Sequence, residues 1–112
     1  MVEAKINYGK IGIRPVIDGR QGGVRESLED KTMAMAQAAK ALIESQVFYA
    51  DGKPMECVIA SRTIGGRGDA GIVSEEFRRE NVVATLTVTA SWCYGTEVLD
   101  MDPQTVKAIW GF

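Results

Sequence analysis

The sequence predicts an α/β domain in which a mainly parallel sheet carries helices on its faces. Strand-like and helix-like segments alternate along the chain, and the clearest strand is apolar on both faces, as strands of parallel sheets are. The length of 112 residues suffices for one core but not for two. We therefore expect residues 1–112 to form a single domain.

The first two elements are a strand and the main helix. Residues 10–19, KIGIRPVIDG, concentrate Ile and Val before a turn, which indicates a strand. Pro15 lacks an amide donor, so it suits an edge strand or a late position in this one. From Ser27 to about Gln46 the apolar residues recur at helical spacing. Ser27, with Asp30 three residues later, resembles a capping box for this helix.

Four further segments complete the predicted elements. The short apolar run 54–61 indicates a second strand, and residues 74–81 indicate a brief helix that starts at Ser74. The Val- and Thr-rich run 82–90 is the clearest strand. After one turn of helix, residues 108–112 form the last strand.

The order of these elements predicts the architecture. Strands separated by helices form a three-layer, mainly parallel sheet, here flavodoxin-like or Rossmann-like, with about four strands and flanking helices. The last predicted strand ends in the apolar residues IWGF, and no helix follows to cover the sheet. We therefore expect the domain to be truncated.

The composition excludes several classes of function. Thirteen basic and fifteen acidic residues are interspersed, which indicates no nucleic-acid partner and no anionic membrane surface. The first ten residues lack an apolar signal core, and no run approaches the roughly 20 apolar residues of a membrane span. Cys57 and Cys93 lie in separate apolar runs, which favours buried free thiols and a cytoplasmic protein. The chain has no histidine, so acid-base chemistry must use other groups or another chain.

Two glycine-rich segments resemble phosphate-binding loops. Residues 66–71, GRGDAG, match the dinucleotide pattern G-x-G-x-x-G. They do not follow the strand directly, and the next strand does not end in an acid, so we interpret them as a flexible loop. Residues 18–26, DGRQGGVRE, join the first strand to the main helix, where glycine amides could bind an anion. A glycine turn with solvated arginines explains this second segment equally well, and Arg20 is its candidate binding residue.

The strongest candidate site combines Arg20 with Trp92 and Tyr94, which follow the third predicted strand. In the flavodoxin-like order, ligands bind at the carboxyl ends of the first and third strands, where the strand order reverses. We expect the three side chains to converge on one crevice there, with Trp92 available for recognition rather than packed in the core. Cys93 points the opposite way from Trp92 if the strand continues, which favours a core thiol over a nucleophile.

Three acids near the end of the chain, Glu97, Asp100 and Asp102, suggest a metal site. Without histidine or a recognisable binding loop, we interpret them as solvated loop charges. We therefore predict no metal ligand and no catalytic residue within this chain.

Five motifs taken together resemble the amino-terminal part of L-fucose isomerase: KIGIRPVIDGR, GVRESLE, ECVIAS, WCYG and DMDPQTVKAIWGF. The likeness runs from about Lys10 to Phe112 and covers a small leading fraction of that family's polypeptide. It implies part of a metal-dependent aldose-ketose isomerase that interconverts L-fucose and L-fuculose and also D-arabinose and D-ribulose. It further implies a cytoplasmic homo-oligomer, a hexamer in the complete enzyme.

The resemblance also implies how the work is divided along the polypeptide. A Mn²⁺ ion would be held by two carboxylates and a histidine in later segments, so we expect this chain to be inactive alone and to hold no cofactor. The leading domain of the family closes over the sugar and reaches the active site of an adjacent subunit. Arg20 matches the position that would donate to sugar hydroxyls, and Trp92 the position that would lie against the apolar side of the sugar. Tyr94 is a further candidate on geometry alone.

Two other functions remain open from the residues. A free-standing flavodoxin-like module would bind a nucleotide or flavin through GRGDAG or DGRQGG, and a purely structural assembly domain would leave the crevice empty. Thermal stabilisation by FMN or NAD would favour the module.

Overall fold

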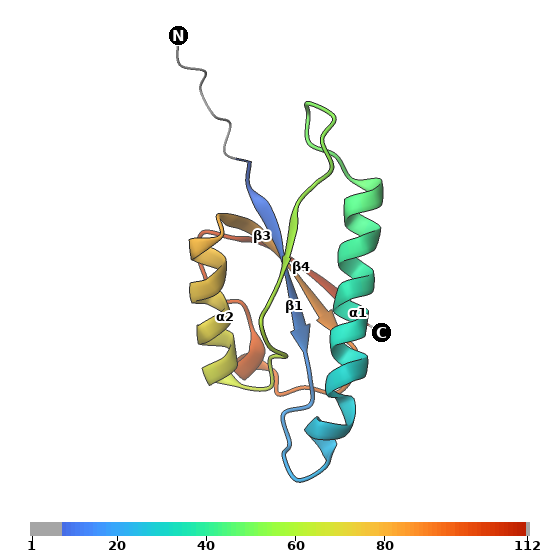
Figure 1. The fold of residues 1–112 in the computed structure, drawn as a ribbon. Coiled ribbons are helices and arrows are strands. Elements are labelled where there is room, and N and C mark those ends of the chain that lie inside the picture. The colour runs from blue at the N-terminus through green and yellow to red at the C-terminus, as the bar shows by residue number, and fades with distance from the viewer. Residues whose placement is uncertain (1–7, 112) are drawn as a thin grey trace.

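The computed structural model describes residues 8–111, in which helices lie on both faces of one sheet (Figure 1). The elements, in chain order, are β1 (Lys10–Val16), α1 (Val24–Gln46), β2 (Cys57–Ile59), α2 (Arg67–Arg79), β3 (Val82–Thr89), the 3-10 turn η1 (Thr96–Val98) and β4 (Val106–Gly111). α1 covers one face of the sheet and α2 covers the other (Figure 1). The predicted three-layer α/β class is thereby confirmed. Neither described helix is long and apolar enough to cross a membrane.

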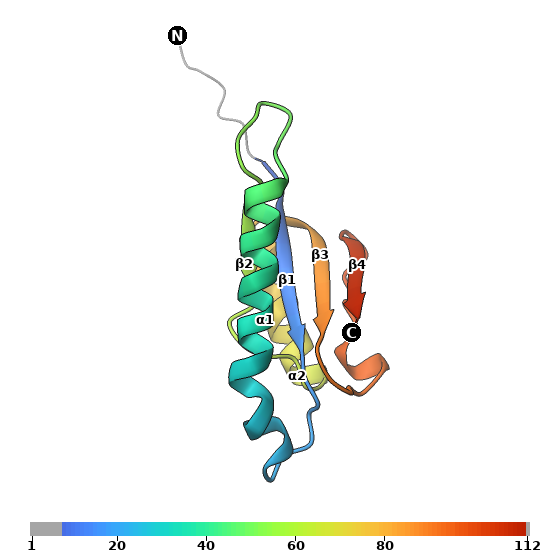
Figure 2. The same ribbon diagram turned by 90° about the vertical axis from the view of Figure 1, so that its right-hand side faces the viewer.

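All four strands are parallel and lie in the order β2-β1-β3-β4 (Figure 2). This is the predicted flavodoxin-like order, and it reverses between β1 and β3. β1 pairs with β3 along the whole of its length but with β2 at only three positions. The loops after β1 and β3 therefore leave the sheet side by side, at the edge where the arrowheads of Figure 2 point.

β1 is a central strand although it contains Pro15. The proline is fully buried and stands opposite Val88 of β3, whereas β2 pairs no further along β1 than Ile13. The missing amide therefore costs no bond to β2, because the β2 ladder has already ended there. Of the two predicted positions, Pro15 takes the late one and not the edge.

Each face of the sheet has its own hydrophobic core. β1 contributes to both because successive side chains point to opposite faces. The core under α1 contains the buried residues Ile13, Ala36, Ala39, Cys57 and Val88. The core under α2 contains Val16, Ala60, Ile64, Ala70, Val73, Phe77, Val82 and Val98.

α1 begins at Val24, three residues before the predicted start, and its cap differs from the predicted one. The backbone amides of Gly22 and Gly23 donate to the carboxylate of Glu26 at 3.1 and 2.7 Å. An acid in the first turn is favourable at the positive end of a helix. Ser27 lies inside the helix, where its hydroxyl donates to the Val24 carbonyl, so the predicted capping box at Ser27 is wrong.

α2 begins at Arg67, seven residues before the predicted Ser74, so the interpretation of residues 66–71 as a loop is wrong. Only Gly66 is extended, as the cap residue before the helix. Asp69 in the first turn accepts a hydrogen bond from the Gly65 amide at 3.0 Å. Its negative charge also stabilises the positive N-terminal end of the helix. The two later glycines of the segment are helical.

The remaining boundaries differ in detail from the prediction. β2 is shorter than the predicted run 54–61, and β4 begins at Val106, two residues before the predicted strand. Phe112, the predicted end of that strand, lies outside the described residues. Residues 103–105 form a turn, in which Asp102 accepts from the Gln104 amide at 2.8 Å, whereas the helical turn of this region is η1.

Candidate functional site

The predicted site residues meet at the carboxyl edge of the sheet. Arg20 stands in the loop after β1, and Trp92 and Tyr94 stand in the loop after β3. The guanidinium carbon of Arg20 lies 5.1 Å from the centre of the Trp92 ring. The rings of Trp92 and Tyr94 lie 4.9 Å apart at an angle of 72°, edge to face. The predicted convergence is confirmed as geometry, because β1 and β3 are neighbours in the sheet.

These three side chains remain open to solvent. Trp92 is 56% exposed, and the side chain of Arg20 is 57% exposed. A large aromatic ring that is this exposed beside a cation contributes little to the core and presents an apolar face to a ligand. We define the carboxyl-edge site as Arg20, Trp92 and Tyr94.

Asp18 holds the Arg20 side chain in place, although it is not one of the predicted site residues. Its carboxylate accepts hydrogen bonds from Arg20 Nε at 3.0 Å and from Nη2 at 2.6 Å. It also accepts from the Arg20 backbone amide at 3.1 Å, so the pair closes an Asx turn. These hydrogen bonds lower the pKa of Asp18 and raise the pKa of Arg20. The signal in the sequence is an Asp two residues before an Arg at a strand end.

The loop around Asp18 is fixed by two neighbouring loops. The Asp18 amide donates to Ser91 Oγ, in the loop after β3, at 3.3 Å. Gly19 lies against Gly65, in the loop before α2, so closely that a Cβ on Gly19 would stand 2.1 Å from the Gly65 carbonyl oxygen. A side chain at position 19 would therefore push these loops apart.

The predicted anion site in residues 18–26 is already filled by the protein itself. The Gly22 and Gly23 amides that would face an anion donate to Glu26. Arg25 is not solvated either, because its guanidinium pairs with Glu29 at 2.9 Å and with Asp69 at 3.0 Å. This segment is therefore a glycine turn closed by internal ion pairs, and of its two arginines Arg20 is the more exposed.

The dinucleotide pattern in residues 66–71 does not form a phosphate loop. Gly68 and Gly71 lie in α2, where a Cβ would meet no atom within 4 Å. In a phosphate loop the glycines permit close approach of a backbone or ligand, and neither position is crowded here. The segment therefore gives no support to a nucleotide or flavin site.

A buried polar network lies behind the carboxyl-edge site. Arg14, fully buried in β1, donates to Thr87 Oγ1 and to the Val98 carbonyl, both at 2.6 Å. Asp100 accepts from Thr85 Oγ1 and Thr105 Oγ1, each at 2.7 Å. These bonds hold the loop that contains η1 against β3.

The acids of this loop are structural rather than solvated. Asp102 is buried and pairs with Arg78 of α2 at 3.2 Å. Burial raises the pKa of Asp100, but the hydrogen bonds from Thr105 and Thr85 outweigh it and lower the pKa overall. The interpretation of Asp100 and Asp102 as solvated charges is therefore wrong, whereas Glu97 is partly exposed and lies 4.0 Å from Arg67.

Both cysteines are free thiols, and neither lies among reactive partners. Burial raises the pKa of Cys57 to about 11. Burial, with the nearby charge of Asp18, also raises the pKa of Cys93, which packs against the core under α2. Cys93 thus packs against the core, as predicted, and its raised pKa disfavours the thiolate that a nucleophile needs.

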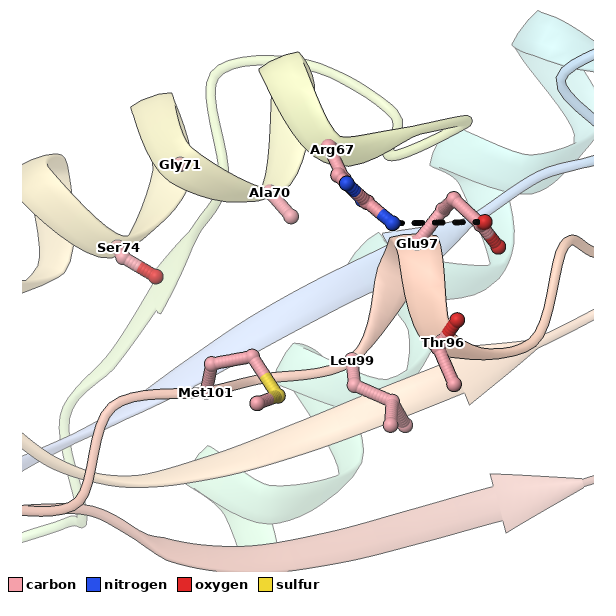
Figure 3. A pocket seen from close by; sticks show the side chains of 8 residues that line it. All are labelled: Arg67, Ala70, Gly71, Ser74, Thr96, Glu97, Leu99 and Met101. Atoms are coloured by element: carbon pink, nitrogen blue, oxygen red, sulfur yellow. Dashed lines mark ion pairs between the residues drawn. The ribbon is translucent and has the colours of Figure 1, made fainter.

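A hollow of about 490 Å³ lies between α2 and the segment that contains η1 (Figure 3). Its lining residues are Arg67, Ala70, Gly71, Ser74, Thr96, Glu97, Leu99 and Met101. The lining is mainly apolar, and its charged groups, Arg67 and Glu97, face each other in Figure 3. Few polar groups are left to orient a small ligand, so the hollow is a weaker candidate than the carboxyl-edge site.

The chemistry of the carboxyl-edge site suits binding rather than bond making. The guanidinium supplies donors in fixed directions, and the rings supply apolar surface. Asp18, with its lowered pKa, is ionised at neutral pH and engaged by Arg20. Across residues 8–111 there is no group of three Asp, Glu, Cys or His side chains that could hold a metal ion. The arrangement can orient a small polar ligand that has an apolar side.

Comparison with known proteins gives one consistent family. The model of the family described as L-fucose isomerase, first N-terminal domain, matches residues 8–112. The chain is 73% identical over 105 residues to L-fucose isomerase of Clostridium perfringens, which is 94% of this chain and 18% of the relative. Identity to L-fucose isomerase of Phocaeicola vulgatus is 60% over the same shares. Identity to that of Haemophilus influenzae is 55%, over 95% of this chain and 18% of the relative. The chain thus spans about a fifth of the length of these relatives.

Proposed function

Because the chain belongs to the family of the first N-terminal domain of L-fucose isomerase, we propose that it forms the sugar-covering part of that isomerase. The complete enzyme would interconvert L-fucose and L-fuculose, and also D-arabinose and D-ribulose. This chain would supply the carboxyl-edge site to the bound sugar and would be inactive without the rest of the polypeptide.

One observation carries the proposal: Arg20 and Trp92 lie in contact, exposed, at the point of the sheet where the strand order reverses. Folding brings them together from positions 72 residues apart (92 − 20). An exposed ring costs free energy in water unless something covers it, and this edge is where ligands of open α/β sheets bind. A partner with an apolar side and several hydroxyls fits such a pair.

The three residues would divide the sugar between them. Arg20 would donate hydrogen bonds to ring hydroxyls, and Trp92 would lie against the apolar side and the methyl group of L-fucose. Tyr94, packed edge to face on Trp92, would fix the orientation of that ring and extend the apolar surface. None of these roles transfers a proton or an electron.

The described residues of this chain do not fit the Mn²⁺ ion that the family resemblance implies. The described part of the chain offers no set of three metal-ligating side chains, and the sequence contains no histidine. We propose that the ligands belong to other parts of the complete enzyme, and we assign no step of the isomerisation to residues of this chain.

The proposal includes a cytoplasmic homo-oligomer, a hexamer in which this part reaches the site of an adjacent subunit. The free thiols of Cys57 and Cys93 suit a reducing compartment. The exposed apolar side chains of Val106 and Ile109 on β4 suit a chain that packs against more protein, because parallel sheets are normally covered on both faces.

The test is the variant Trp92→Ala in the complete isomerase. Loss of the ring should lower kcat/KM for L-fucose by about tenfold or more, since Trp is prominent among the interface residues whose truncation costs about 2 kcal/mol or more. Steady-state kinetics with L-fucose and with D-arabinose measure the effect. The loss should be larger for L-fucose, whose methyl group adds apolar surface.

A matched control is Phe48→Ala, which removes another exposed aromatic ring, in the loop between α1 and β2. That variant should retain the kinetic constants of the parent enzyme. If Trp92→Ala leaves both substrates unaffected while the enzyme stays folded, the proposed sugar contact is wrong.

A further inference from the structure

We propose that Asp18 is a positioning residue that holds the Arg20 guanidinium beside Trp92 and compensates its charge, so that the site accepts a neutral sugar rather than an anionic one. The inference rests on the proposed function of the carboxyl-edge site. It concerns a residue that would act through Arg20 and not on the sugar itself.

The first argument is that Arg20 needs to be held. Its side chain is 57% exposed, and an exposed arginine ordinarily samples many rotamers whose loss on binding opposes affinity. The Asp18 carboxylate, only 4% exposed, accepts from Nε and Nη2 at once. Such paired hydrogen bonds fix the plane of a guanidinium as well as its position. Arg20 is therefore oriented before any ligand arrives.

The second argument is that Asp18 itself is fixed to both sides of the site. Its Oδ1 accepts from the Arg20 amide at 3.1 Å, which closes the turn after β1. Its own amide donates to Ser91 Oγ at 3.3 Å, immediately before Trp92 in the chain. Asp18 thus links the loop that carries the cation to the loop that carries the ring.

The third argument concerns which donors are left for a ligand. Asp18 uses the Nε and Nη2 edge of the guanidinium, so Nη1 is directed away from the carboxylate. That nitrogen can donate to hydroxyl oxygens. The compensated charge gives no net attraction to a phosphate group, because the attraction between Arg20 and the phosphate is opposed by the repulsion between Asp18 and the phosphate. A neutral polyhydroxy ligand loses nothing by this compensation.

The experiment uses the complete isomerase with Asp18→Asn, Arg20→Ala and the double variant. Asp18→Asn keeps the shape and removes the charge. We expect KM for L-fucose to rise about tenfold with kcat within about twofold, because charge-assisted hydrogen bonds are worth more than neutral ones. Inorganic phosphate should also become a competitive inhibitor of Asp18→Asn, while the parent enzyme is unaffected.

The double variant isolates the action through Arg20. If Asp18 acts only by holding and compensating that side chain, Asp18→Asn should add nothing to Arg20→Ala, and the phosphate inhibition should disappear. Additive effects would overturn the proposal. The matched control Asp30→Asn, the same change at an exposed position of α1, should match the parent in KM and in phosphate response.

The outcomes separate this proposal from the proposed function. If Arg20→Ala raises KM but Asp18→Asn does not, the positioning role is wrong while the sugar site stands. If Arg20→Ala leaves KM unchanged, the proposed contact of Arg20 with the sugar is itself wrong. Melting temperatures monitor folding, and Asp18→Ser, which can still close the turn, serves as a second variant. If neither Asp18 variant folds, Asp18 is required for the fold and the positioning proposal is overturned.

Discussion

Arg14 is a charged side chain in the middle of a hydrophobic sheet. It is 2% exposed, and its guanidinium reaches Thr87 on β3 and the carbonyl of Val98 in η1. Burial lowers the pKa of Arg14, and the charge of Asp100 opposes that shift. The residue therefore holds the loop behind the carboxyl-edge site in place, although burying its positive charge is unfavourable.

We predict that Arg14→Met destabilises the chain by about 3 kcal/mol. The substitution fills much of the volume but leaves the Val98 carbonyl and the Thr87 hydroxyl without their donor, and Asp100 without its nearby cation. Urea unfolding of the chain, followed by circular dichroism, measures the change.

The control is Arg79→Met at the exposed end of α2, which should change the free energy of unfolding by less than about 0.5 kcal/mol. If Arg14→Met were as stable as the parent, the network around Arg14 would not contribute net stability.

At this scale the sequence predicts some side chains and not others. The proximity of Arg20 and Trp92 could be predicted because a general rule places ligand sites where the strand order reverses. The contacts of Arg14 could not be predicted, because the carbonyl that it binds belongs to a residue 84 positions away in an irregular loop. The burial of Asp102 could not be predicted for a similar reason, because its partner Arg78 lies on a helix face whose orientation no local pattern fixes.

Among the elements, α2 shows how glycine can conceal a helix. Its buried residues Ala70, Val73 and Phe77 follow helical spacing across the segment that the glycines seemed to break. Acid near its start and arginines in its last turn also favour a helix. These signals outweigh two glycines, whose cost is about 1 kcal/mol each.

We predict that Gly71→Ala stabilises the chain by about 0.5 to 1 kcal/mol. Gly71 is helical and a Cβ there would meet no atom within 4 Å, so alanine would lower the entropy of the unfolded chain without strain. Thermal and urea unfolding of the chain measure the gain.

The opposite change in stability is expected for Gly12→Ala in β1. A Cβ at that position would stand 2.4 Å from the Phe77 ring, so the variant should be destabilised by more than about 1 kcal/mol. A loss of stability in Gly71→Ala would contradict the helical assignment and favour a loop that needs its glycines.

Strand positions were predicted more closely than helix starts. The runs of Val, Ile and Thr that form β1 and β3 are bounded by turn residues, so few other secondary-structure assignments fit them. The start of α1 depends on Glu26 reaching back to two glycine amides, a contact that the pattern Ser27 and Asp30 imitates in sequence. Caps of this kind are decided by three-dimensional geometry.

Across the whole molecule, several carboxylates have lowered pKa values. Hydrogen bonds from backbone amides, that of Gly23 first, lower the pKa of Glu26, and the hydrogen bond from Lys40 lowers that of Glu44. Asp100 is shifted in the same direction. In each case the folded chain holds the proton less strongly than the unfolded chain does, so ionisation favours the fold.

We predict that the chain is equally stable at pH 7 and 6 and loses stability as the pH falls through about 4.5 and 3.8, the ordinary values for Glu and Asp. Below these values the unfolded chain binds protons first, and the stabilisation disappears as the pH falls through the lower folded pKa values. Urea unfolding at a series of pH values from 7 to 3 measures this dependence.

Paired variants assign the effect. Glu26→Gln and Glu44→Gln should each show a shallower fall between pH 5 and 3 than the parent, because each variant removes one carboxylate whose pKa is lowered in the fold. Rising stability in that interval would contradict the pKa directions.

The close approach of Gly19 to Gly65 has a practical consequence for protein engineering. In a library that randomises the carboxyl-edge loops to change which sugars are accepted, these two positions leave no space for a side chain. Any residue larger than glycine at position 19 would move Asp18 and Arg20 together. A productive library would therefore keep both glycines and vary Trp92 and Tyr94, whose side chains point outward and can change size without forcing the backbone to follow.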